Sequence, residues 1–160
     1  MLMRLLGSAL LVAAALMFSS PGQPNAADQD GVVRVKSAYD MPETLKRLKK
    51  DVADKGIMFF SEIDQAKLAA DAGVTLLPST LLVFGNPPLG TLFLTSDPDA
   101  GLDWPVRLLV YQDDKGQVWV AYTDFAWIAR RHGIANRDKE FKMASEVIAS
   151  ITSTVLPDGP

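Results

Sequence analysis

Short apolar segments alternate with turn residues along this chain, and their spacing predicts alternating strands and helices. Between two predicted strands, Leu45, Leu48 and Val52 recur at helical spacing after Asp40, an N-cap residue, and Gly56 supplies a residue that ends the helix. Branched and aromatic residues predict strands at 32–35, 57–63 and 81–84, and a short strand at 74–77.

The clearest strand pair comprises residues 106–112 and 117–122, joined by a turn in which Gly116 offers a positive φ. Asp64 and Asp124 as N-caps, with Gly73 and Gly133 as stops, predict helices over 65–72 and 125–132. A turn at 86–88 precedes a predicted helix over 89–96, which Asp97 and Pro98 end, and a last helix carries apolar residues from 141 to 151 on one face. The first of these helices presents small side chains, Ala66, Ala69 and Ala70, so we expect it to approach the sheet closely. The order of elements predicts a single-domain α+β fold with helices packed on a largely antiparallel sheet.

The N-terminal segment predicts export. Arg4 precedes an apolar or small-residue run over 5–18, which is shorter than the roughly 20 residues that span a bilayer. We expect a signal peptide over 1–26 and a periplasmic or secreted location, with a retained N-terminal anchor as the alternative. The chain has no cysteine, which excludes a lipoprotein anchor. The expected remainder is a flexible leader (27–31), one domain (32–155) and a tail without order (156–160).

The charge balance narrows the range of partners. Without residues 1–26 the chain has 15 basic and 19 acidic residues, a net charge of −4. Such an acidic domain has no electrostatic footprint for nucleic acid, and we expect no membrane contact after signal removal. The one basic run, 46–50, lies on a predicted helix, where a solvated face is the better interpretation than a polyanion site.

Five segments together resemble a known family, and the Gly-Asn-Pro step at 85–87 is their most specific part. The segments are 60–64, 77–87, 89–91, 100–105 and 118–122. They are similar to the DUF302 (TT1751-like) domains, with the resemblance running from about Val32 to Ile151. It implies a compact α+β domain that forms a dimer, and no established activity. Many relatives carry histidine after the Ile-Asp pair, where this chain has Gln65, so we expect no metal or proton-transfer role there.

The inventory of catalytic groups is small. With one histidine and no cysteine, a tetrahedral zinc site is excluded. Asp97, Asp99 and Asp103 do not have the spacing of a calcium loop, and we expect them to cap turns. His132 lies at a predicted helix end, where it complements the helix dipole. We therefore expect no metal and no cofactor.

Four residues have the best claim to a ligand site: Asn86, Asp103, Tyr122 and His132. The first three are expected to converge near one end of the sheet, either as a site or as a hydrogen-bond cluster that holds the loops. The leading function is a non-catalytic exported domain of the cell envelope that binds a small molecule or an envelope protein, with homodimer formation. The alternative is a small hydrolase or isomerase that uses His132 or Asp103 as general acid or base.

Overall fold

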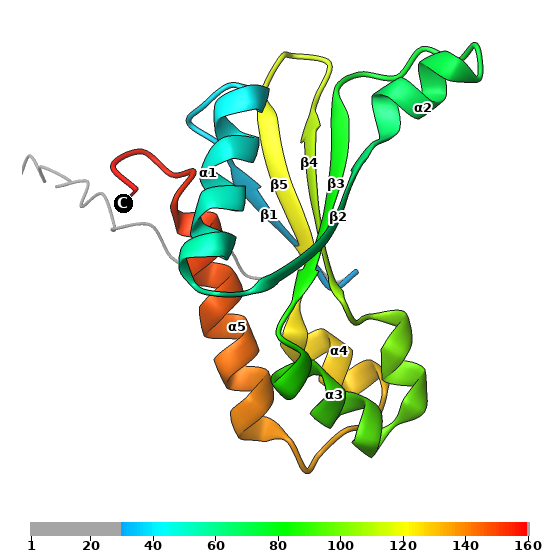
Figure 1. Cartoon of the computed structure of the whole chain (residues 1–160), viewed down its shortest axis with the longest axis vertical. Coiled ribbons are helices and arrows are strands. Elements are labelled where there is room, and N and C mark those ends of the chain that lie inside the picture. The colour runs from blue at the N-terminus through cyan, green and yellow to red at the C-terminus, as the bar shows by residue number, and fades with distance from the viewer. Residues whose placement is uncertain (1–29, 160) are drawn as a thin grey trace, which may run out of the picture.

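A five-stranded antiparallel sheet forms the centre of the molecule (Figure 1). The computed structural model describes residues 30–159, so the expected signal peptide and residues 27–29 of the leader lie outside the described residues. The strands are β1 (Val32–Lys36), β2 (Met58–Asp64), β3 (Ser79–Gly85), β4 (Val106–Gln112) and β5 (Val118–Thr123). Their order is β1-β5-β4-β3-β2, and every neighbouring pair is antiparallel. The predicted α+β architecture is confirmed.

The helices fall into three groups around this sheet. They are α1 (Met41–Asp54), α2 (Gln65–Asp71), α3 (Pro87–Ser96), the 3-10 helix η1 (Pro98–Leu102), α4 (Phe125–Arg131) and α5 (Asp138–Ser153). Figure 1 shows α1 and α5 along one side of the sheet, and α3 and α4 gathered below it. It shows α2 at the opposite end, apart from every other helix.

The core lies between the sheet and the pair α1 and α5. In the central strands Leu82 is paired with Leu108, and Val110 with Val120, and all four side chains are buried. The helices contribute a second buried layer, which consists of Leu48, Val52, Phe141, Ala144, Ile148 and Ile151. The apolar spacing of the first and last helices therefore identifies their buried faces correctly.

Local chemistry explains where the helices begin. Asp40, Asp64, Asn86 and Asp124 each precede a helix, and each side-chain oxygen accepts a hydrogen bond from a backbone N–H of the first turn. Such caps satisfy donors that have no partner within the helix. Pro87 and Pro88 fit the first turn of α3 because that turn does not need their missing N–H groups.

Two predictions about the segment after β2 are wrong. Residues 74–77 form no strand, and β3 begins only at Ser79, after Pro78, which has no backbone N–H to donate to a ladder. The alanines of α2 do not seat the helix closely on the sheet, since none of its seven residues is buried. At the other end of the chain, residues 156–159 form a turn in which the Gly159 N–H donates to the Leu156 carbonyl.

Candidate functional site

A buried carboxylate joins η1 to the end of α4. The Asp103 side chain is 3% exposed, and His132 Nε2 lies 2.7 Å from its Oδ2 atom. Arg131 Nη1 donates to Oδ2 at 3.1 Å, and Arg107 Nη2 donates to Oδ1 at 3.2 Å. We call these four residues the Asp103 cluster. Three donors thus satisfy one carboxylate that water barely reaches.

Helix ends bring these residues together. Asp103 directly follows η1 and His132 directly follows α4, so each occupies the C-cap position. We predicted that the loop aspartates cap turns. Asp97 does so, since its side chain accepts a hydrogen bond from the Asp99 N–H. The prediction is wrong for Asp103, whose carboxylate accepts from the side chains of the cluster instead. The predicted role of His132, to complement the helix dipole, is incomplete. Its side chain is 6% exposed and forms a hydrogen bond with a carboxylate.

The imidazole of His132 lies between two carboxylates. His132 Nε2 is occupied by Asp103, and Nδ1 lies 3.8 Å from Oδ2 of Asp97. Nε2 is thus hydrogen-bonded to a buried carboxylate, and Nδ1 lies near a second carboxylate. The geometry instead ties α4 to the loop that leads into β4.

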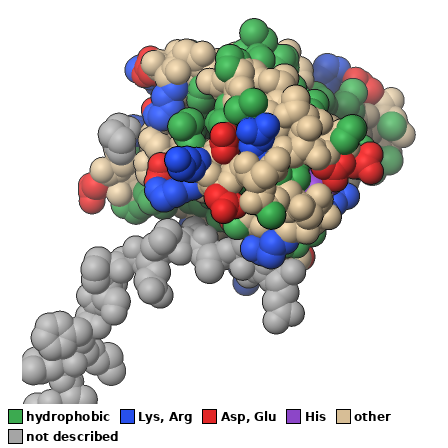
Figure 2. Space-filling view, turned by 90° about the horizontal axis from the view of Figure 1, so that it is seen from below, with side chains coloured by type: hydrophobic (Ala, Val, Ile, Leu, Met, Phe, Trp, Pro, Cys, Tyr) green, Lys and Arg blue, Asp and Glu red, His purple; other side chains and the backbone are tan. Residues whose placement is uncertain are grey.

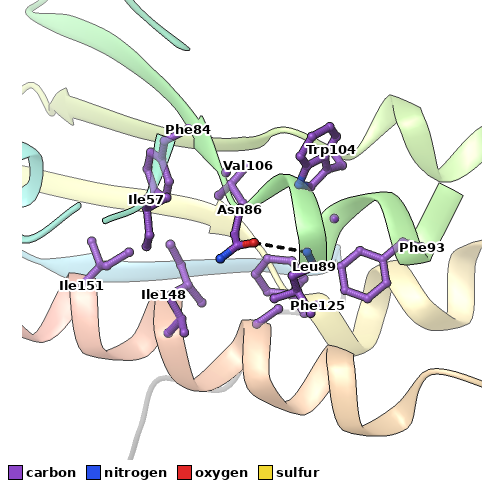
Figure 3. A pocket seen from close by; sticks show the side chains of 14 residues that line it. Ile57, Phe84, Asn86, Leu89, Phe93, Trp104, Val106, Phe125, Ile148 and Ile151 are labelled. Carbon is purple, nitrogen blue, oxygen red and sulfur yellow. Dashed lines mark hydrogen bonds between the residues drawn. The ribbon is translucent and has the colours of Figure 1, made fainter. Parts of the chain in front are cut away.

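Asn86 lies apart from this cluster, at the mouth of an apolar pocket between β3, α3 and α5 (Figure 3). Its Oδ1 atom accepts from the Leu89 N–H at 3.2 Å and caps α3. The pocket has a volume of about 50 Å³, and no residue of its lining is charged. Asn86 is exposed, so the pocket opens to solvent beside its amide.

Trp104 forms one wall of the same pocket and packs against two glycines. A Cβ atom on Gly90 would lie 1.8 Å from the Trp104 Nε1 atom, and one on Gly85 would lie 3.1 Å from it. The indole therefore occupies space that any other residue at position 90 would fill. Phe60 of β2 meets the indole edge-on, with ring centroids 6.2 Å apart.

Tyr122 lies on the core face of β5, paired with Leu108 of β4 and Val33 of β1. Burial raises the pKa of its phenol above the usual value, and the nearby Asp124 charge raises it further. A hydrogen bond with Thr152 of α5 acts in the opposite direction. Tyr122 is thus a core residue with one polar partner.

The four predicted residues share one end of the sheet but have three different environments. Asp103 and His132 are in direct contact, although 29 positions separate them. Asn86 lines the apolar pocket, and Tyr122 packs under α5. The structure places Asn86, Asp103 and Tyr122 at a common end of the sheet, as expected. No hydrogen bond joins these three residues to one another.

One segment exposes many large apolar side chains, which the sequence pattern did not predict. Eleven large hydrophobic side chains are exposed in the described part of the chain, and eight lie within residues 58–77. These are Met58, Phe59, Phe60, Ile63, Leu68, Val74, Leu76 and Leu77. We call this segment, which comprises β2, α2 and the connection to Pro78, the apolar arm. Adjacent Phe59 and Phe60 were a signal of it, since neighbouring strand residues face opposite sides and one sheet face cannot bury both.

Charges elsewhere are mixed in sign. The four cations of α1 at 46, 47, 49 and 50 each pair with an acidic side chain, as expected for a solvated face. Figure 2 shows basic and acidic side chains interspersed over one face of the molecule. Within residues 30–159 no group of three or more metal-binding side chains occurs. None of the described helices has the length and apolarity needed to cross a membrane.

The described residues thus form an α+β domain, in which an antiparallel sheet has helices on one face and a capped helix follows the Gly-Asn-Pro step. The chain belongs to the family described as "Domain of unknown function DUF302", which matches residues 33–155. The fold is shared by the crystal structure of an uncharacterised conserved DUF302 protein from Bacillus stearothermophilus. The TM-score is 0.71 at 16% identity, over 79% of this chain and 98% of that one.

Curated relatives share a part of their length with this chain. It is 36% identical over 104 residues to "Fluoride-specific ion channel FluC 1" of Brucella suis biovar 1 (strain 1330). That match covers 65% of this chain and 41% of the relative. The protein of the same name from Brucella abortus biovar 1 (strain 9-941) is also 36% identical over 104 residues, which are 38% of its length. The chain therefore spans about two fifths of these relatives.

Proposed function

We propose that this chain is a non-catalytic binding domain of the cell envelope, exported by its N-terminal segment, and that it pairs with a second copy of itself through the apolar arm. The observation that carries the proposal is the concentration of eight of the eleven exposed large hydrophobic side chains in residues 58–77. Apolar side chains scattered over a protein surface are normal, whereas a concentration of them in one segment indicates an interaction site.

A second copy suits this surface because β2 is an edge of the sheet. Its outer backbone groups have no strand beside them, and a two-fold axis brings the same edge of another copy alongside in antiparallel orientation. The pairing with β3 is regular from Ser61 to Asp64, after a bulge at Phe60. No lysine or proline lies on β2 to block such pairing, and Glu62 is already neutralised by Lys49.

A groove next to the arm adds to this interface. It has a volume of about 430 Å³ and lies between the end of the arm and the face of the sheet opposite α1 and α5. Its apolar lining comes from Leu76 and Leu77 of the arm and from Leu109 and Tyr111 of β4. The groove adds apolar surface at the end of the arm where β2 leads into α2.

Catalysis is not part of the proposal because the Asp103 cluster uses its own polar atoms. Both nitrogens of His132 face carboxylates, and Asp103 has three donors. The names of the Brucella relatives describe proteins of which about two fifths match this chain. We therefore do not extend ion conduction to it.

The test measures the mass of the chain from Ala27 onward in solution by light scattering after gel filtration. We expect the wild type to have twice the monomer mass at about 50 µM, a range in which weak homodimers form. Leu68→Asp should give a monomer with an unchanged circular dichroism spectrum. The matched control is Leu102→Asp, since Leu102 is 65% exposed but lies off the arm, and Leu68 is 58% exposed.

The outcomes separate clearly. A monomeric wild type at 50 µM overturns pairing with a second copy, and so does equal dissociation by the two variants. Export is tested separately by the intact mass of the protein recovered from the periplasm, where loss of residues 1–26 is expected. Recovery of the uncleaved chain in the membrane fraction contradicts that part of the proposal.

A further inference from the structure

The pocket beside Asn86 has the composition of a small-ligand site, and it adjoins the apolar arm where Phe60 packs on Trp104. Its apolar wall includes Ile57, Phe84, Trp104 and Ile148. Small-molecule sites combine such walls with a few polar groups that fix the orientation of the ligand. Here the polar group is the Asn86 amide at the mouth, while the Trp104 indole nitrogen lies against Gly90.

The hydrogen bond of Asn86 fixes how its amide is turned. The Leu89 N–H can only donate, so the atom that faces it must be the amide oxygen. The Nδ2 group then points the other way and has no hydrogen-bond partner among residues 30–159. Figure 3 shows this nitrogen turned away from Leu89, toward the side of the pocket that Ile57 and Ile148 line. The pocket therefore presents a free N–H donor at its mouth.

The rest of the lining decides which chemical class fits. Trp104 Nε1 also has no partner among the described residues, and it too can only donate. The one side-chain acceptor of the lining, Asn86 Oδ1, is used by the cap, and no lining residue is charged. A ligand must therefore bring an acceptor. A carboxylate would enter an apolar pocket without a cation to compensate it, which is unfavourable.

The volume limits the apolar part of the ligand. An engineered protein cavity of about 150 Å³ binds benzene. At about 50 Å³, this pocket admits the end of an alkyl chain of roughly two to four carbons, with the remainder near the exposed Asn86.

We propose that this pocket binds a neutral carbonyl compound with a short alkyl chain, such as an amide, ester or ketone. The carbonyl oxygen accepts a hydrogen bond from Asn86 Nδ2, and the alkyl end contacts Ile57, Ile148 and the Trp104 wall. The same side chain thus starts α3 with its oxygen and binds the ligand with its nitrogen.

The experiment is an NMR titration of the ¹⁵N-labelled chain from Ala27 with pentanamide, up to 50 mM. The Asn86 side-chain NH₂ signals and the Trp104 indole signal should shift and saturate, whereas the indole signals of Trp119 and Trp127 should not. Trp119 and Trp127 do not line the pocket, so they are internal references. Pentanoate and pentylammonium are the controls, and both should bind at least threefold more weakly than pentanamide.

Matched variants of Asn86 isolate the proposed contact. Asn86→Asp and Asn86→Ser both keep a good helix cap and both remove the NH₂ donor. Each should weaken pentanamide binding by about threefold to tenfold, the range of one neutral hydrogen bond. Agreement between the two variants excludes the new charge of aspartate as the cause. Ala144→Leu fills the pocket from α5 and should abolish the shift of the Trp104 signal.

Three results overturn the inference. One is the lack of a saturable shift of the Trp104 signal up to 50 mM pentanamide. Another is unchanged affinity in Asn86→Asp and Asn86→Ser, and the third is equal or tighter binding of pentylammonium. None of these results bears on pairing through the apolar arm, because Leu68 and the groove at Leu76 lie outside this pocket.

Discussion

The helices α2 and α4 are built alike, yet α4 packs into the core and α2 lies in solvent. Each has seven residues. The carboxylates of Asp64 and Asp124 accept from the backbone N–H three positions on, at 2.8 and 2.7 Å. Each helix is followed by a glycine in the left-handed region, Gly73 with φ 75° and Gly133 with φ 62°. The same capping interactions therefore determine where both helices begin and end.

Their surroundings differ completely. α4 buries Phe125 and Ile128 and lies next to α5, whereas α2 has no buried residue. The end of α4 is tied to a buried carboxylate through Arg131 and His132. The ion pair of α2, Lys67 with Asp71, lies within the helix and in solvent. The comparison teaches that caps decide where a helix forms, while neighbouring elements decide how much it adds to stability.

The largest expected contrast between the two helices is in their apolar side chains. Ile128→Ala should lower the free energy of unfolding by about 2–5 kcal/mol, because it leaves a cavity between α4 and the core. Leu68→Ala should change it by less than about 0.5 kcal/mol in a dilute sample, since the side chain is 58% exposed. Urea titrations at about 1 µM protein measure both. Equal losses in the two variants would contradict the comparison.

A smaller contrast is expected for the caps. Asp124→Ala should cost about 1 kcal/mol of global stability, because unfolding α4 exposes the core. Asp64→Ala should affect global stability less and accelerate amide exchange over 65–71, because α2 can unfold locally. Asp124→Asn and Asp64→Asn keep a cap and serve as controls. A global loss with Asp64→Ala as large as that with Asp124→Ala would show that α2 is coupled to the core.

The smallest expected effect is a pH dependence of the free energy of unfolding, which arises from Tyr122 near the start of α4. Burial raises the folded-state pKa of Tyr122, and the Asp124 charge adds to the shift. In the unfolded chain a tyrosine has a pKa of about 10, so above that pH the unfolded state loses this proton first. The stability from the neutral phenol is fully present below pH 10 and is lost as pH rises through the folded pKa.

Tyr122→Phe removes this proton and therefore this loss. Between pH 10 and 11, wild type should lose more stability than the variant, by at most about 1.4 kcal/mol per pH unit. The difference should shrink in an Asp124→Asn background, because that background lacks the charge that adds to the shift. Parallel curves of stability against pH for the wild type and Tyr122→Phe would contradict this prediction.

Most elements of the fold were predictable because their signals are local. The caps Asp40, Asp64 and Asp124 and the hairpin around Gly116 were all identified from residues a few positions apart. The segment 74–77 was the exception, since its apolar residues favour a strand but no strand lies beside them. Strand composition indicates which segments are able to pair, and the sheet decides which of them do.

The candidate site was only partly predictable. Asp103 and His132 were each singled out from the sequence, but their 2.7 Å contact depends on η1 and α4 ending side by side. Arg107 and Arg131 had no signal of their own. The pocket at Asn86 likewise depends on Trp104 packing against Gly90, fourteen positions earlier in the chain.

The sequence by itself determined the kinds of elements, their ends and the family, because caps, turn glycines and apolar spacing act over a few residues. Only the tertiary structure decided that α4 is buried and α2 is not, and that Asp103 meets His132. It also left the apolar arm exposed. Burial and long-range contacts depend on the whole packed arrangement, and the same capped seven-residue helix is compatible with either outcome.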